Sequence, residues 1–188
     1  MGLSRREQLG FEYFVNESTG ISSLNEVAAE LSFQGFQLHF HVAGDRAAGL
    51  ALDAIAGSNL LPGPHRLTHL YLVDDKDRAS FASSNIVADF QLAPSSLSPS
   101  YVREMSGVIG TDRASELLPA TELLDEGALL TISSDWDADT LSPLVKLQTV
   151  LTRNPGQPIP DIDTAIEMMT INAARLLQHD DQTGSVSV

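Results

Sequence analysis

The sequence predicts an α/β fold, in which strands alternate with helices around a parallel sheet. Three observations support this prediction. Four short segments alternate apolar and polar residues as strands do, helical segments follow them, and each strand carries polar side chains on one face. Strands separated by helices pair in parallel, because the crossover returns the chain to the same end of the sheet.

The expected strands are four short segments bounded by turn residues. FQLHFHV alternates strictly between apolar and polar residues, and the third and fourth segments place apolar side chains opposite polar ones. We expect strands at 36–42, 65–73, 86–93 and 128–136.

The expected helices have recognisable ends. Ser23 with Glu26 forms a capping box, Gly57 marks a helix end, and Pro119 is expected to break a helix. The Ser-, Pro- and Gly-rich stretch 94–113 reads as a long loop over the pocket, because long connections in compact domains are usually functional. We expect helices at 23–35, 45–59, 74–85, 114–127, 141–153 and 161–178.

Length and composition exclude several classes of function. A chain of 188 residues is one domain by length, or part of a larger one. The net charge of −14 argues against nucleic-acid binding and against docking on anionic lipid. The absence of cysteine excludes disulfides and thiolate metal sites. No apolar run approaches the ~18 residues of a membrane helix, and no signal-peptide core follows the first charges, so a cytoplasmic location is the default expectation.

Each expected strand has one polar face, and its polar residues gather toward the carboxyl end. In (β/α) barrels that end carries the active site. Two imidazoles and a carboxylate meeting there would suit a zinc-like divalent ion. The polar sets are Gln37, His39 and His41 on the first strand, His65 and His69 with Leu67 on the second, Asp89 and Gln91 on the third, and Thr131, Ser133 and Asp135 on the fourth.

Each of these residues also has a plainer interpretation. A lone histidine in a strand is more often a hydrogen-bonded core residue, and an aspartate after a strand is more often the N-cap of the next helix. Their joint occurrence at one level of successive strands favours a metal site. Spacing does not decide between His39 and His41, although His41 lies nearer the carboxyl end and is the better candidate ligand.

Four stretches resemble the metal-dependent amidohydrolase superfamily, in the branch called amidohydrolase family 3. They are HFHVAGDRAAGLALDAI, PHRLTHLYLV, ISSDWDADTLSPLVKLQTVLTR and TAIEMMTINAARLL, and the resemblance runs from about Ser23 to Val188. It implies a (β/α)₈ TIM-like barrel with a small β-sandwich. On that basis residues 1–182 are the C-terminal half of the barrel, with strands 5–8, and residues 183–188 begin a truncated sandwich strand.

The resemblance also implies an activity and a set of site residues. It implies hydrolysis of a C–N bond in a small amide or cyclic amide, with zinc as the metal and two metal ions in an intact relative. His41 and His69 would bind metal, His39 would be a bystander, and Asp135 would contact the metal and take a proton from the attacking water. The candidate substrate contacts are Gln91, Trp136 and Arg113. Arg113 could pair with a substrate carboxylate, although its type and place favour a surface residue at a helix start, and Trp136 reads equally as packing.

Three positions depart mildly from the family pattern. Ser133 stands where glycine is usual, Thr68 stands where an acidic residue is usual, and Gln91 is followed by Leu92 in place of proline. We expect these changes to tune the pocket.

The larger departure is what the sequence lacks. A (β/α)₈ barrel needs roughly 250 residues, and neither the first-strand His-x-His nor the bridging ligand of the fourth strand is present. We therefore expect half of a barrel with half of the metal site, weak metal binding and no activity alone. The alternatives are a catalytically inactive fragment and a binding module that dimerises through its open sheet edges.

Overall fold

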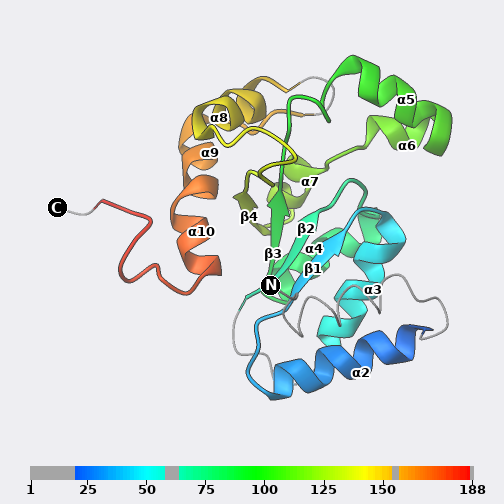
Figure 1. Ribbon diagram of the computed structural model, residues 1–188, viewed down its shortest axis with the longest axis vertical. Helices are drawn as coiled ribbons and strands as arrows, with labels where there is room; N and C mark the ends of the chain where they lie inside the picture. The colour runs from blue at the N-terminus through cyan, green and yellow to red at the C-terminus, as the bar shows by residue number, and fades with distance from the viewer. Residues whose placement is uncertain (1–19, 58–63, 154–156, 187–188) are drawn as a thin grey trace.

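A computed structural model describes residues 20–57, 64–153 and 157–186 of the chain. Four strands form one parallel sheet in the order β1-β2-β3-β4 (Figure 1). This confirms the predicted α/β class and the parallel sheet. The strands are β1 (His39–Val42), β2 (His65–His69), β3 (Ile86–Phe90) and β4 (Leu129–Ile132). Each strand is shorter than predicted, β1 at its start, β2 and β3 at their ends, and β4 at both.

Helices connect the strands and cover one face of the sheet. α3 packs on β1 and β2, α4 packs on β3, α7 packs on β3 and β4, and α9 and α10 pack on β4. The helices are α2 (Gly20–Phe33), α3 (Asp45–Ala56), α4 (Asp75–Ser83), α5 (Pro99–Ile109), α6 (Thr111–Ser115), α7 (Ala120–Asp125), α8 (Pro143–Thr152), α9 (Ile162–Met169) and α10 (Ile171–Leu176). No described helix combines the length and apolarity that crossing a membrane requires.

The core lies between this outer face of the sheet and the helices. Burial of its apolar side chains is the main stabilising contribution, at about 25 cal/mol for each Å² removed from water. The strand residues in the core are Phe40, Val42, Leu67, Ile86, Ala88, Phe90, Leu130 and Ile132, all less than 9% exposed.

The stretch 94–113 is largely helical, which corrects the prediction of a loop. α5 begins at Pro99, where proline suits a first helical turn because its missing N–H would be unpaired there anyway. The Ser98 side chain accepts a hydrogen bond from the Tyr101 N–H at 3.2 Å, which caps the helix. Composition therefore misled the prediction, since serine and proline here are helix-start signals. α5 and α6 lie beyond the carboxyl ends of the strands (Figure 1).

Two other predicted elements also differ in detail. The break expected at Pro119 is present, since α6 ends before it and α7 begins after it. The helix expected over 161–178 is two helices, because Thr170 leaves the helical conformation with φ −126° and ψ −88°. Residues 183–186 form no strand, and residues 187 and 188 lie outside the described part of the chain.

Candidate functional site

Strand register brings a row of polar side chains together on the inner face, opposite the helices. His41 pairs with Thr68, Thr68 with Asp89, and Asp89 with Thr131 across the four strands. His39 pairs in the same way with Arg66. The polar set predicted for the second strand was therefore wrong for His65 and Leu67, since Arg66 and Thr68 face inward there.

His65 and Leu67 lie on the outer face, and both are 0% exposed. The His65 Nδ1 atom accepts a hydrogen bond from the Leu38 N–H at 2.8 Å, so the ring holds the neighbouring strand. Burial lowers the pKa of His65 and keeps its imidazole neutral. For this residue the plainer interpretation, a hydrogen-bonded core histidine, is the correct one.

His69 departs from strand geometry at the end of β2. Strict alternation would place it outside with Leu67, but its φ of 75° and the φ of 49° at Leu70 are left-handed. The His69 ring lies against the ring of His41, with 4.2 Å between ring centroids and 58° between ring planes. Left-handed residues other than glycine cost of order 1–3 kcal/mol, and they cluster at functional sites.

Asp135 lies three residues beyond β4 and is also left-handed, with φ 52°. Its charge acts on His69. Burial is the main cause that lowers the pKa of His69, and His41 adds to it, whereas Asp135 and Asp89 raise it. The net shift is downward, so the His69 ring is held in the neutral form that binds metals. The structure thus brings His41 and His69 into contact and Asp135 into electrostatic reach of His69.

The side-chain types of His41 and His69 suit a metal ion, but the described residues bring together too few ligands to complete a site. Two adjacent imidazoles are typical donors for zinc-like ions. Within the described residues neither ring forms a hydrogen bond, unlike the rings of His65 and His39, so the ring nitrogens are available to a metal ion. A closed zinc site needs four ligands, and a catalytic one needs three from the protein. Within 20–57, 64–153 and 157–186, no group of three or more His, Cys, Asp or Glu side chains is placed to hold a metal ion.

His39 is committed to a different partner. Its Nδ1 atom lies 2.7 Å from the Arg66 Nη2 atom, and the guanidinium can only donate. Desolvation, followed by the charge of Arg66, lowers the pKa of His39 to about 4. This ring is therefore neutral, with one nitrogen already used.

Asp89 is the centre of a hydrogen-bond network that the sequence did not reveal. The carboxylate is 2% exposed. A buried carboxylate needs such partners, because an unpaired one would be strongly unfavourable. Its donors are Thr68 Oγ1 at 2.8 Å, Thr131 Oγ1 at 2.8 Å, Ser133 Oγ at 3.0 Å and Gln91 Nε2 at 3.0 Å, and the Arg66 guanidinium lies 3.9 Å away.

The three candidate substrate contacts have different surroundings. The Gln91 amide nitrogen is used in the Asp89 network, where it also donates to Thr68 and Ser133. Trp136 is 67% exposed beside Asp135. Arg113 forms an ion pair with Asp45.

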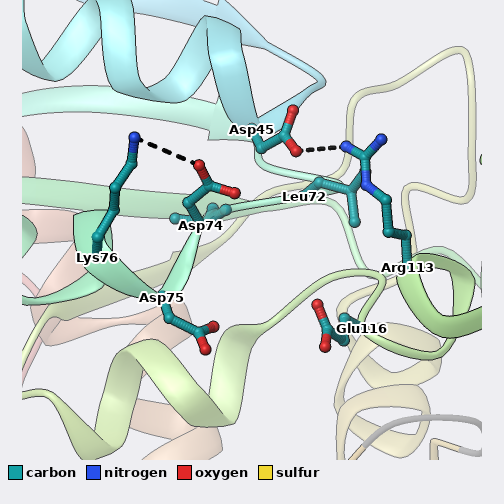
Figure 2. Close-up of a pocket in the computed structure, with 8 residues that line it drawn as sticks. Asp45, Leu72, Asp74, Asp75, Lys76, Arg113 and Glu116 are labelled. Atoms are coloured by element: carbon teal, nitrogen blue, oxygen red, sulfur yellow. Dashed lines mark hydrogen bonds and ion pairs between the residues drawn. The ribbon is translucent and has the colours of Figure 1, made fainter.

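Arg113 and Asp45 line a pocket of about 400 Å³ (Figure 2). Figure 2 shows the Arg113 guanidinium turned toward Asp45, and Lys76 turned toward Asp74, at 3.5 Å. The pocket wall contains none of His41, His69 and Asp135. The pocket and the histidine pair are therefore separate features of the molecule.

A row of rings extends from the histidine pair toward α5. The rings of His69 and Tyr71 are stacked with centroids 6.3 Å apart, and those of Tyr71 and Tyr101 are 6.4 Å apart. Burial, with a smaller effect of Tyr71, raises the pKa of Tyr101. Neither tyrosine is predicted from the sequence, and Tyr101 lies in the stretch 94–113, for which the composition predicts a loop.

Comparison with known proteins identifies relatives of this architecture. The amidohydrolase family model matches residues 4–188. Among solved structures, an uncharacterized metal-dependent hydrolase from Pyrococcus furiosus aligns with a TM-score of 0.70 and 18% identity, over 88% of this chain and 34% of that one. No curated protein sequence matched the chain.

Two further solved structures show the same fold. A Xaa-Pro dipeptidase with bound methionine aligns with a TM-score of 0.62 and 16% identity, over 89% of this chain and 40% of that one. An A. niger ochratoxinase aligns with a TM-score of 0.62 and 18% identity, over 89% of this chain and 37% of that one. The chain thus spans between 34% and 40% of the length of these three structures. Its four-stranded parallel sheet is consistent with part of such a barrel.

Proposed function

Because this chain belongs to the amidohydrolase family, we propose that its four strands are strands 5–8 of the barrel. We propose further that it supplies His41, His69 and Asp135 to the hydrolysis of a C–N bond. The substrate would be a small amide or cyclic amide, and the metal would be zinc. Family membership supports a metal-dependent hydrolase, whereas the metal, the bond and the residues are our inference.

The observation that carries this proposal is the contact between the His41 and His69 rings. It joins the carboxyl ends of β1 and β2, with 4.2 Å between the ring centroids. The other histidines of the sheet, His39 and His65, each have a ring nitrogen in a hydrogen bond. The contacting pair is thus the pair whose nitrogens are available.

The chemistry expected of the site divides between the metal and Asp135. A bound divalent ion would lower the pKa of a water molecule toward ~7 and polarise the scissile carbonyl. The Asp135 carboxylate would take the proton of that water and pass it to the leaving nitrogen. Its position beyond β4, within electrostatic reach of His69, supports this role, because groups on different strand ends face a common centre in barrels.

The proposed substrate contacts follow from the surroundings of each residue. Gln91 would contribute through its amide, whose orientation the Asp89 network fixes. Trp136 offers an exposed ring beside Asp135. Arg113 would meet a substrate carboxylate only by sharing its guanidinium with Asp45, so we rank it last of the three.

We also propose that the chain alone binds metal weakly and has little or no activity. The described residues bring together two imidazoles, which is fewer than the three protein ligands of catalytic zinc sites. Residues that act as a unit lose most of their activity when one is missing. Association of two copies through the sheet edges remains a prediction, and the mass in solution tests it.

Hydrolysis assays test the proposal. The purified chain with excess zinc would be given N-acyl amino acids and cyclic ureides, beside the variants Asp135→Asn and Asp137→Asn. Asp137 is an exposed aspartate in the same loop, so it is the matched control. We expect hydrolysis close to the buffer rate, and any zinc-dependent excess to vanish in D135N but not in D137N. Hydrolysis that survives in D135N, or that needs no metal, would contradict the proposed roles.

A further inference from the structure

Lys146 on α8 is buried, which is unusual for a lysine. It is 2% exposed, although lysine side chains almost always reach solvent. An ammonium group in such a position requires a partner of opposite charge and further hydrogen bonds. The contacts of Lys146 therefore indicate what the protein gains from burying it.

Lys146 joins three parts of the chain. Its Nζ atom forms an ion pair with Asp139, whose side chain is 18% exposed. The same atom donates a hydrogen bond to the backbone oxygen of Gln91 at 3.3 Å. One ammonium group thus connects α8, the end of β3 and the segment that follows β4.

That segment, residues 134–142, carries Asp135 and Trp136 between β4 and α8 (Figure 1). Its own hydrogen bonds are local. The Ala138 backbone N–H donates to the backbone oxygen of Asp135 at 2.8 Å, and the Trp136 backbone N–H donates to Ser134 Oγ at 3.2 Å. Ser133, just before residue 134, donates a hydrogen bond to Asp89, so the segment is held at its start as well. Among the side chains of 134–142, all within the described part of the chain, Asp139 alone forms a hydrogen bond or ion pair with another element.

We propose that Lys146 is a positioning residue, which holds the 134–142 segment so that Asp135 stays within electrostatic reach of His69 beyond the carboxyl end of β4. The inference rests on the function proposed above for Asp135, because Lys146 acts only through the place of that carboxylate. Lys146 itself touches neither histidine of the pair in the structure as described.

Trp136 provides a direct readout, because it is the sole tryptophan and adjoins Asp135. The experiment compares the intact chain with Lys146→Met and Asp139→Asn, which break the ion pair from its two ends. In both variants we expect the Trp136 anisotropy to fall and its quenching by acrylamide to rise. The double variant should change the Trp136 signal no more than either single variant, because two substitutions that break the same interaction do not have additive effects.

Lys76→Met is the matched control. Lys76 also pairs with an aspartate, but its side chain is 75% exposed and it lies far from Trp136 in the sequence. This variant should leave the Trp136 signal unchanged. Far-UV circular dichroism and the urea midpoint show whether each variant is folded, and if K146M does not fold, D139N, at the more exposed end of the ion pair, decides alone.

An unchanged Trp136 signal in folded D139N would overturn the inference. So would a double variant whose change is the sum of the two single changes. Failure of the proposed function has a different signature, namely an intact Trp136 response together with metal binding that ignores His41 and His69. This result would support the positioning role of Lys146 and would contradict only the proposed function.

Discussion

The two halves of the inner sheet face differ in how their polar groups are satisfied. On the β3–β4 half, Asp89 is 2% exposed and accepts hydrogen bonds from four side chains. On the β1–β2 half, His41 is exposed, and its ring and that of His69 meet each other without a hydrogen-bond partner in the described chain. We infer that the first half stabilises the sheet and that the second half is free to bind a ligand.

The largest effect should come from removing the centre of the buried half. Asp89→Ala would leave Thr68, Thr131, Ser133, Gln91 and Arg66 without their shared acceptor. Breaking a buried charged network from one side typically costs about 3–5 kcal/mol. Urea denaturation should show a loss of that size in the free energy of unfolding.

Asp180→Ala is the control for this prediction. Asp180 is exposed near the end of α10, so its loss should change the free energy of unfolding by less than about 0.5 kcal/mol. A similar small effect for Asp89→Ala would mean that the network contributes little, and the contrast between the two halves would disappear.

A smaller, pH-dependent effect should come from His65 on the outer face. Burial lowers its pKa below the ordinary value of 6.5, so the unfolded chain takes up a proton that the folded chain resists. Stability is therefore full above pH 6.5 and falls as the pH drops below it, because the unfolded state then binds more protons. Lowered pKa values at His39 and His69 act in the same direction.

His65→Asn isolates this contribution. The asparagine oxygen can take over the role of Nδ1 as acceptor for the Leu38 N–H, but it does not titrate. Urea midpoints measured between pH 7 and pH 5 should fall less steeply in the variant than in the parent chain. Parallel curves would show that His65 titrates alike in the folded and unfolded states.

The smallest effect on stability should come from the exposed half. His41→Gln removes an exposed ring that forms no hydrogen bond within the described part of the chain. We expect the free energy of unfolding to change by less than about 0.5 kcal/mol, as at ordinary surface positions. A loss of several kcal/mol would indicate that His41 is a structural residue like Asp89.

The sequence predicted the architecture well because alternation and helix signals are local. The failures arose where the backbone leaves its regular period. Alternation assigned His69 and Leu67 to one face, and a left-handed residue at the end of β2 is not visible in the pattern. Ser98 and Pro99 likewise resemble a loop by composition, yet they begin α5.

The site could be predicted only residue by residue. His41, His69 and Asp135 were singled out by type and place, whereas the Asp89 network depends on contacts between three strands. Two of its members, Thr68 and Ser133, are positions that depart from the family pattern, and both donate to Asp89. Their shared partner becomes visible only in the folded chain.

The central claim is that His41 and His69 form the available donor pair, and zinc affinity tests it most directly. A competition titration with a chromogenic chelator would compare the parent chain with His41→Gln, His69→Gln and His39→Gln. We expect weak binding by the parent, a loss of at least about tenfold in H41Q and H69Q, and little change in H39Q, because even outer partners of ligands are worth 10–100-fold. Equal affinity in all four proteins, or a loss confined to H39Q, would contradict the account.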